Sequence, residues 1–158
     1  MNILHLTHTD INADSRIIKE MKSLSKEEHY NIYGVGVNFE KGTVREDLKK
    51  FNIKTKSLKI FSKNLKILPR QIRHPLVFME LFIKVLFYIN KKNLKVVHCH
   101  DTLVLPIGYF IKRIKKCKLF YDAHELESNK NGQTKFMSWG TLFIEKKIWK
   151  SIDLLISV

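Results

Sequence analysis

The sequence predicts an α/β fold, in which a Rossmann-like, doubly wound parallel sheet of about six strands carries helices on its faces. Short, continuously apolar runs are typical of strands that are buried on both faces of a parallel sheet. Between these runs lie longer segments in which apolar residues recur at helical spacing. Because crossovers between parallel strands are right-handed, this alternation favours the doubly wound topology.

The expected strands are short and mostly apolar. They are residues 1–6, 32–37, 53–58, 95–99, 118–122 and 153–158, of which the third is the weakest. Gly34 and Gly36 lie in the second strand, where the absence of a Cβ allows another backbone to approach closely. Cys99 lies within the fourth strand, where we expect a buried, inert thiol.

Helices are expected between the strands. The first follows Asp14, whose side chain is suited to cap a helix N-terminus, and Ile17 and Ile18 lie on its apolar face. The other helices are expected at residues 76–90, 102–114 and 137–150, and a polar loop is expected at 127–135. In the last helix, the side chains expected to face the core are Trp139, Phe143, Ile144 and Ile148.

The helix at 76–90 is expected to begin after Pro75, and it is apolar on nearly all sides apart from Glu80 and Lys84 one turn apart. Its aromatic residues are expected to face the core; they are Phe78, Phe82 and Phe87. This run is too short and too interrupted by charge to span a bilayer. The N-terminus also lacks the basic segment and long apolar region of a secretory signal.

Composition excludes several classes of protein. The chain has 158 residues, of which 44% are hydrophobic, so one domain with a full core is expected and a disordered chain is excluded. Two cysteines cannot form a disulfide framework, so a reducing cytoplasm is the expected location. The net charge of +14 favours an anionic partner, such as nucleic acid, a membrane surface or a phosphorylated small molecule.

Polar residues follow several of the expected strands, and ligands of open parallel sheets bind beyond the carboxyl ends of the strands. Three of these ends carry a histidine close to a carboxylate; they contain His8 and Asp10, His100 and Asp101, and His124 and Glu125. The amino ends carry mainly lysine and asparagine. No P-loop or Gly-x-Gly-x-x-Gly motif follows the first strand, so a classical ATP or NAD site is not expected.

A metal site is one interpretation of this polar edge. His98 and His100 alternate along a strand and therefore face the same side, where Asp101 and His124 could join them as ligands. The sequence has neither a His-Glu-x-x-His motif nor a spaced set of cysteines. We therefore expect no metal.

The other interpretation is that the edge exchanges hydrogen bonds and protons with a hydroxyl-rich substrate. His124 lies between Asp122 and Glu125, and either carboxylate can orient its ring or favour its charged form. We therefore expect His124 to be functional and His5 and His98 to be structural. For His100 both alternatives stand.

Several segments resemble, in their order and spacing, the N-terminal half of retaining family-4 glycosyltransferases. The matching segments are residues 2–8, 14–20, 96–101 and 119–125, together with Glu145 and residues 153–157. The resemblance implies half of a GT-B fold, whose active site lies in the cleft between two Rossmann-like domains. Residues 1–158 would be the acceptor-side domain; the C-terminal nucleotide-sugar domain would be absent, so the chain looks truncated and is expected to be inactive alone.

The resemblance also implies a reaction, in which a sugar passes with retention from a nucleotide-sugar donor to a saccharide or lipid-linked acceptor in bacterial surface polysaccharide biosynthesis. It implies no tightly bound cofactor and no essential metal. His124 matches the histidine that reaches the donor sugar and is the expected catalytic residue. The expected substrate-binding residues are His8, Asp14, Arg16, His100, Asp101 and Glu125. Many family members carry a Gly-Gly pair in the first loop, where this chain has residues 11–14.

The positive charge is most localised in residues 59–73, where basic and apolar side chains are interleaved. This pattern favours docking on an anionic membrane through Lys63, Lys66, Arg70 and Arg73, which implies a cytoplasmic protein that is peripheral on the inner membrane face. A solvated, lysine-rich surface is the alternative, and nucleic acid is not an expected partner. Two other functions stay open: a standalone flavodoxin-like module that binds a nucleotide or phosphate, and a basic membrane-docking domain.

Overall fold

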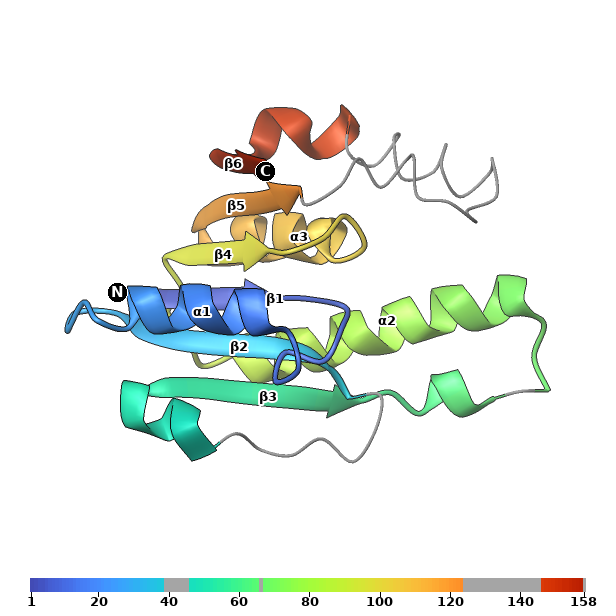
Figure 1. Ribbon diagram of the computed structural model, residues 1–158. Coiled ribbons are helices and arrows are strands. Elements are labelled where there is room, and N and C mark those ends of the chain that lie inside the picture. Colours follow the sequence, from blue (N-terminus) through green and yellow to red (C-terminus); the bar gives the residue numbers. More distant parts are fainter. Residues whose placement is uncertain (39–45, 66, 124–145, 158) are drawn as a thin grey trace.

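Strands and helices alternate along the chain in the computed structural model, which describes residues 1–38, 46–65, 67–123 and 146–157 (Figure 1). The strands are β1 (Asn2–Leu6), β2 (Asn31–Asn38), β3 (Ile53–Lys59), β4 (Val96–Cys99), β5 (Lys118–Ala123) and β6 (Leu154–Ser157). The helices are α1 (Ser15–Leu24), α2 (Arg70–Ile89) and α3 (Leu105–Lys115). Short 3-10 helices lie at Glu46–Phe51, Ser62–Asn64 and Trp149–Ser151.

The strands form one parallel sheet in the order β3-β2-β1-β4-β5-β6. The chain starts at β1, builds outward to β3, and then returns to β4 on the other side of β1. The point between β1 and β4 is therefore the topological switch point of a doubly wound sheet. This confirms the predicted Rossmann-like α/β class, and every expected strand is present to within one residue of its bounds.

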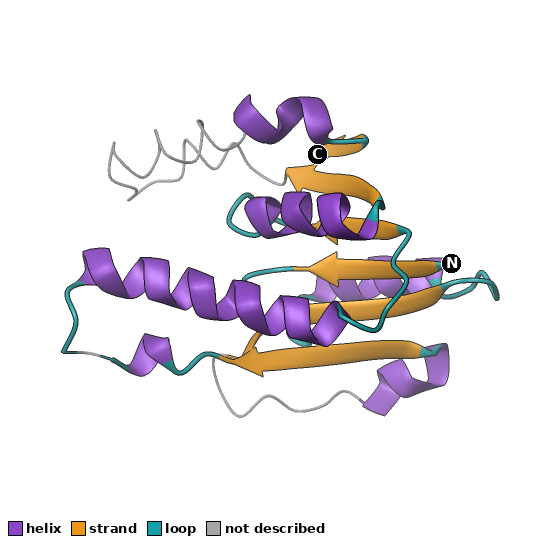
Figure 2. Cartoon of the chain, turned by 180° about the vertical axis from the view of Figure 1, so that it is seen from behind, coloured by secondary structure: helices purple, strands orange, loops and turns teal. Residues whose placement is uncertain are grey.

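Helices cover both faces of the sheet. α1 lies on one face, and α2 and α3 lie on the opposite face (Figures 1 and 2). Ile3 of β1 and Val96 of β4 belong to the apolar core that includes Ile17 of α1. Their neighbours Leu4 and Val97 belong to the core under α2 and α3. Successive residues of each strand thus serve opposite faces, as the two-residue period of a strand requires.

Asp14 caps α1, as its position in the sequence predicts. Its Oδ1 accepts hydrogen bonds from the backbone N–H groups of Arg16 at 3.1 Å and Ile17 at 3.2 Å. These groups have no partner within the helix, and such a cap stabilises a protein by about 1 kcal/mol.

The expectation that the second helix begins after Pro75 is wrong, because α2 begins at Arg70 and contains Pro75. A proline at this position cannot donate a hydrogen bond to the carbonyl of Gln71. Gln71 lies in the first turn and is exposed, so water can bond to this carbonyl instead. The helix therefore continues through the proline.

The expectation that Phe78 and Phe87 face the core is also wrong. Phe87 is 77% exposed, and Phe78 is exposed as well, while Phe82 packs partly buried against the core. The buried stripe of α2 repeats every four residues and consists of Leu81, Val85 and Ile89. A helix that lies on one face of a sheet buries only one stripe, so its other apolar residues stay at the surface.

α3 begins at Leu105, three residues later than the start expected at 102. It lies close against β4 because Gly108 has no side chain, since a Cβ there would lie 2.2 Å from Sγ of Cys99. Cys99 is buried, as expected, and burial raises the pKa of its thiol well above the ordinary value. The polar loop at 127–135 and most of the last expected helix, residues 137–145, lie outside the described residues. Of the core residues expected in that helix, Trp139, Phe143 and Ile144 lie outside as well, and Ile148 is buried.

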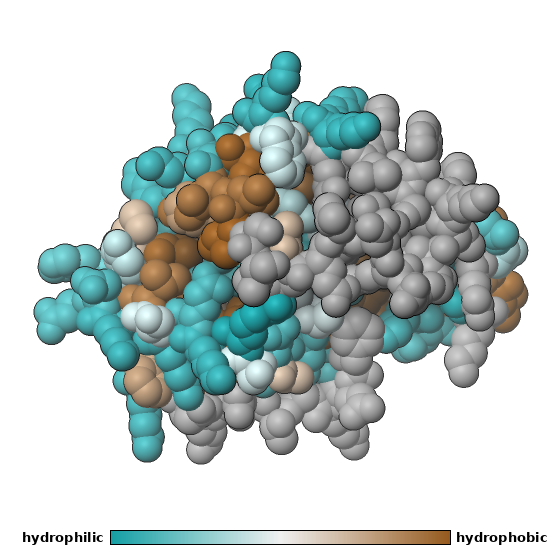
Figure 3. Space-filling view, turned by 45° about the horizontal axis from the view of Figure 1, so that its top comes forward, coloured by the Kyte–Doolittle hydropathy of each residue, from teal (hydrophilic) through white to brown (hydrophobic). Residues whose placement is uncertain are grey.

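Within the described part of the chain, no helix combines the length and the apolar character needed to cross a bilayer. Apolar side chains gather at the β6 end of the molecule, which Figure 3 turns forward, and hydrophilic side chains border them. The exposed large apolar residues of this end are Trp149, Leu154 and Leu155.

Candidate functional site

The loop that follows β1, residues 7–14, lies against the carboxyl edge of the sheet. The N–H of Val37 donates a hydrogen bond to the carbonyl of Thr9 at 2.9 Å. This approach depends on Gly36, because a Cβ there would lie 2.4 Å from the same carbonyl oxygen. Ile11 of the loop is fully buried. The glycine that permits close backbone contact is thus in β2, whereas the loop itself is anchored by an apolar side chain.

Side chains tie the same loop to β3. Oδ1 of Asp10 accepts hydrogen bonds from Oγ of Ser57 at 3.0 Å and from the N–H of Asn12 at 3.0 Å. Nδ2 of Asn12 in turn donates to Oγ of Ser57 at 2.9 Å. The loop between β1 and α1 is therefore held by β2 and β3, which fixes the backbone that carries His8.

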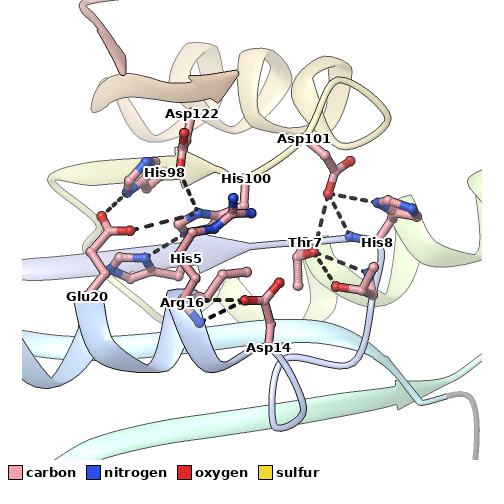
Figure 4. Close-up of polar contacts among 12 residues, drawn as sticks. His5, Thr7, His8, Asp14, Arg16, Glu20, His98, His100, Asp101 and Asp122 are labelled. Atoms are coloured by element: carbon pink, nitrogen blue, oxygen red, sulfur yellow. Dashed lines mark hydrogen bonds and ion pairs between the residues drawn. The ribbon is translucent and has the colours of Figure 1, made fainter. Parts of the chain in front are cut away.

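His8 and Asp101 meet at the switch point, as Figure 4 shows. Nδ1 of His8 lies 2.8 Å from Oδ2 of Asp101, which follows β4. The same oxygen accepts the N–H of His8 and the hydroxyl of Thr7, each at 3.2 Å. The other oxygen of Asp101 accepts the N–H of Val104 at 3.3 Å, just before α3. Oγ1 of Thr7 also lies 2.9 Å from Oγ1 of Thr9. One buried carboxylate thus joins the ends of β1 and β4.

The electrostatics of this pair favour a charged carboxylate. Burial alone would raise the pKa of Asp101, but the contacts with His8 and Thr7 outweigh burial and lower the pKa below its ordinary value. A carboxylate at Nδ1 favours the tautomer of His8 that carries hydrogen there. The side chain of His8 is 35% exposed. Its oriented ring can therefore exchange hydrogen bonds with a ligand at the edge.

Asp14 and Arg16 lie at the start of α1. Oδ1 of Asp14 is engaged in the helix cap, and the side chain of Arg16 is exposed to solvent. The structure therefore places both residues at the helix N-terminus that faces the carboxyl edge (Figure 4).

His100 does not lie with His8 and Asp101, because it is buried on the α1 face of the sheet. It joins His5, His98 and Glu20 in a group that we call the histidine cluster (Figure 4). Nδ1 of His5 lies 2.9 Å from Nε2 of His100, and Nδ1 of His98 lies 3.0 Å from Oε1 of Glu20. Nδ1 of His100 lies 3.5 Å from Oδ2 of Asp122.

Burial sets the charge of this cluster. It lowers the pKa of His5 well below the ordinary value, and the neighbouring His100 and His98 lower it further. Burial likewise lowers the pKa of His100, and the contact with Asp122 offsets this only in part. Burial would raise the pKa of Glu20, but the hydrogen bond from His98 and the charges of His98 and His100 lower it overall. Burial therefore favours the neutral forms of His5 and His100.

The two-residue spacing of His98 and His100 predicts that they share a face of the sheet, and the structure confirms it. The sequence pattern does not predict that His5 and Glu20 belong to the same cluster. The available signal is the register of the sheet, in which His5 of β1 lies directly opposite His98 of β4. Once β1 and β4 are taken as neighbours, the shared side of these histidines follows. Glu20 cannot be placed in this way, because its position depends on how α1 lies across the sheet.

The remaining predicted site residues are only partly described. His124, Glu125 and Lys66 lie outside the described residues, as does the side chain of Arg70. Lys63 is exposed in the 3-10 helix before α2, and Arg73 is partly buried in the first turns of α2. Around them, large apolar side chains are exposed to solvent; they are Phe61, Leu65, Ile67 and Ile72.

No protein-family model and no curated protein matches the chain in sequence. Solved structures match its fold. A sucrose-phosphate synthase from Thermosynechococcus elongatus gives a TM-score of 0.68 at 10% identity, over 98% of this chain and 42% of that chain. HepE of Anabaena, solved in complex with UDP, gives 0.59 at 12% identity, over 98% of this chain and 37% of that chain.

The lipopolysaccharide outer core galactosyltransferase WaaB, in its apo form, gives a TM-score of 0.56 at 13% identity, over 82% of this chain and 35% of that chain. This chain thus spans between 35% and 42% of the length of these three proteins. At such low identities the likeness concerns the fold. The six-stranded, Rossmann-like domain matches one half of GT-B enzymes.

Proposed function

We propose that this chain is the acceptor-side domain of a retaining glycosyltransferase with a GT-B fold. The observation that carries the proposal is the pair of His8 and Asp101 at the switch point of the sheet, where ligands of this fold class bind. Hydroxyl groups of Thr7 and Thr9 lie beside the pair. Such a surface offers donors and acceptors to the hydroxyl groups of a saccharide.

The matched structures support this proposal. WaaB is described as a galactosyltransferase, and the HepE structure holds UDP. The complete enzyme would use a nucleotide sugar as co-substrate and no tightly bound cofactor. Because this chain matches less than half of those proteins, the nucleotide-sugar site belongs to the other half in this proposal.

His124 is the proposed catalytic residue, and Glu125 is proposed to bind substrate beside it. The resemblance to retaining family-4 glycosyltransferases implies that the reaction retains configuration and passes through an oxocarbenium-like transition state. A dipole close to the sugar stabilises such a state. Arg16 lies near the N-terminus of α1 and would favour departure of the nucleoside diphosphate, since anions bind at such helix ends. In a protein that carries both domains, His124→Ala should reduce turnover by roughly 100-fold or more and leave folding unchanged.

The acceptor is proposed to be a saccharide or a lipid-linked saccharide of a bacterial surface polysaccharide, reached at the inner membrane face. Support comes from the segment before and at the start of α2. There Ile67 is 98% exposed and Phe61 is 69% exposed, next to the basic Lys63. Apolar anchors among basic side chains are suited to an anionic lipid surface.

A thermal-shift screen of the chain tests the proposal. The ligands are alkyl glycosides, nucleotide sugars and free nucleotides, and His8→Asn is compared with His29→Asn, a control at an exposed histidine at the amino edge. We expect glycosides to raise the melting temperature of the wild type and of the control but not of His8→Asn. Tight binding of free nucleotides by this chain alone would contradict the proposal and would favour a nucleotide-binding module.

A further inference from the structure

The histidine cluster brings together four side chains that can each ligate a metal ion. One ligand atom from each of His5, Glu20, His98 and His100 can be chosen such that all four atoms lie within 4.8 Å of one another. The three imidazole rings pack tightly, with ring centroids 4.2 Å apart for His98 and His100 and 5.1 Å apart for the pairs that include His5. Figure 4 shows these rings and Glu20 facing one another between α1 and the sheet.

The fold itself produces this convergence. β1 and β4 are neighbours at the switch point, and their register places His5 opposite His98. His100 follows two residues later on the same face. Glu20 reaches the group from α1, the helix that covers this face. Three separate segments of the chain therefore contribute ligands, and each ligand sits on or directly beside a regular element.

Hydrogen bonding within the cluster does not satisfy all of its ring nitrogens. Nδ1 of His5 and Nδ1 of His98 have partners at 2.9 Å and 3.0 Å. Nε2 of His5 and Nε2 of His98 are buried and have no hydrogen-bond partner among the described residues. Buried polar atoms are rarely left without a partner, and an unexplained one often marks an ion or a water. These two atoms show that hydrogen bonds among the described side chains leave the cluster incompletely satisfied.

The donor set indicates which ion would fit. Imidazole nitrogens and one carboxylate oxygen suit zinc and its first-row neighbours, whereas magnesium and calcium prefer oxygen ligands. Zinc binds such ligands at about 2.0–2.1 Å, so neighbouring ligand atoms of a tetrahedral site lie about 3.4 Å apart. The atoms of the cluster would need only small side-chain movements to reach that spacing from their present separations of at most 4.8 Å.

Asp122 can orient one histidine of the cluster, and Glu20 lies where an ion can enter from solvent. Oδ2 of Asp122 lies 3.5 Å from Nδ1 of His100, the arrangement in which a carboxylate directs the other nitrogen of a histidine toward a metal. The side chain of Glu20 is 30% exposed, whereas those of His98 and His100 are almost fully buried. An ion would therefore reach the histidines past Glu20.

We propose that His5, Glu20, His98 and His100 form a binding site for one divalent transition-metal ion, with zinc as the preferred ion. The ion would join α1 to β1 and β4 and would stabilise the face of the sheet next to the His8 and Asp101 pair. The ligand set considered from the sequence, for which no metal was expected, combined His98 and His100 with Asp101 and His124. The proposed site has His5 and Glu20 in place of those last two residues. The proposal is independent of the proposed glycosyl transfer, because none of its tests requires a sugar substrate.

Metal binding by the untagged, EDTA-treated chain tests the proposal. Zn²⁺ and Co²⁺ are titrated against a chromophoric chelator, and the visible spectrum of the Co²⁺ form is recorded. We expect one ion per chain, a Co²⁺ spectrum with the intense bands of four-coordinate nitrogen and oxygen ligation, and a higher melting temperature with Zn²⁺. Absence of stoichiometric binding would overturn the proposal.

Two variants and one control locate the site. Glu20→Gln changes a partly exposed side chain and should fold normally, while its affinity for Zn²⁺ should fall by roughly 10-fold or more. His98→Gln should remove binding, with circular dichroism as the check on folding. His74→Gln, at an exposed histidine of α2, should bind as the wild type does. Wild-type affinity in folded Glu20→Gln, or equal losses in His74→Gln and Glu20→Gln, would overturn the assignment.

Discussion

Nδ1 of His8 lies 2.8 Å from Oδ2 of Asp101, so a residue from the loop after β1 and a residue from the end of β4 form one polar unit. The unit lies where the strand order reverses, and its carboxylate also accepts two backbone N–H groups. The contact thus joins two segments that are distant in sequence. It positions a histidine at the edge of the sheet where a ligand can reach it.

Asp101→Asn should weaken this unit. The amide loses the charge-assisted contact with His8 and one acceptor for the surrounding N–H and hydroxyl donors, so we expect the free energy of unfolding to fall by about 1–3 kcal/mol. Chemical denaturation at pH 7 measures it. Asp153→Asn is a partly exposed control at the amino edge, where the carboxylate contacts Lys112. A loss no larger than that of the control would contradict the role given to Asp101.

Glu80 offers a test by pH. Burial would raise the pKa of Glu80, but hydrogen bonds from Lys84, Ser62 and the N–H of Phe61 lower it from 4.5 to about 2. Because the pKa in the folded state is the lower one, the carboxylate stabilises the fold above about pH 4.5, and this contribution is lost as the pH falls toward 2. Glu80→Gln should therefore lower the free energy of unfolding at pH 7. The expected loss is only about 1 kcal/mol, because solvent screens the contacts of a carboxylate near the surface.

The difference between the wild type and Glu80→Gln should shrink between pH 4.5 and pH 2, the interval between the two pKa values. Urea denaturation across this range gives the two stability curves. Glu27→Gln, at an exposed position of the loop after α1, serves as the control and should run parallel to the wild type. A difference for Glu80→Gln that is constant with pH would count against this account.

Gly36 tests whether the loop after β1 needs close contact with β2. In Gly36→Ala the new Cβ would lie 2.4 Å from the Thr9 carbonyl and 2.7 Å from the Ile11 nitrogen, both backbone atoms that cannot give way easily. We expect a loss of about 2–3 kcal/mol in unfolding free energy. Gly34→Ala meets side-chain atoms at 3.0–3.2 Å and should lose less. Equal effects of the two substitutions in thermal denaturation would show that the backbone contact is unimportant.

Liposome flotation tests the proposed membrane docking. Replacing Lys63, Lys66, Arg70 and Arg73 with glutamine removes four charges from one segment. The matched control replaces four exposed lysines at the amino edge of the sheet; these are Lys91, Lys95, Lys116 and Lys118. Binding to vesicles with anionic lipid should be lost in the first variant and largely kept in the control. Equal losses of vesicle binding in the two variants would mean that binding depends on the total positive charge of the chain and not on this segment.

The fold could be predicted because its signals are local. Buried parallel strands are continuously apolar, and Asp14 caps α1 as its position in the sequence predicts. The start of α2 could not be read in the same way. A proline usually marks a helix start, but at Pro75 the lost hydrogen bond falls on an exposed carbonyl of the first turn, so the helix extends back to Arg70.

The candidate site was predictable only where strand ends define it. His8 and Asp101 follow two strands that an α/β fold places side by side. Glu20 gave no such signal, because a carboxylate on a charged helix normally faces solvent. Its contact with His98 depends on how α1 lies across the sheet. The shared face of His98 and His100 was evident from their spacing, but their partners depended on the pairing of β1 with β4.

The central claim is that this edge of the sheet receives a saccharide acceptor. The most direct test is a titration of the ¹⁵N-labelled chain, followed by NMR, with alkyl glycosides below their micelle concentration and, separately, with UDP and UDP-glucose. The account predicts that glycosides shift the amide signals of residues 7–10 and 100–102, and that UDP and UDP-glucose leave them unchanged at the same concentration. Saturable binding of UDP at these residues, without any response to glycosides, would contradict it.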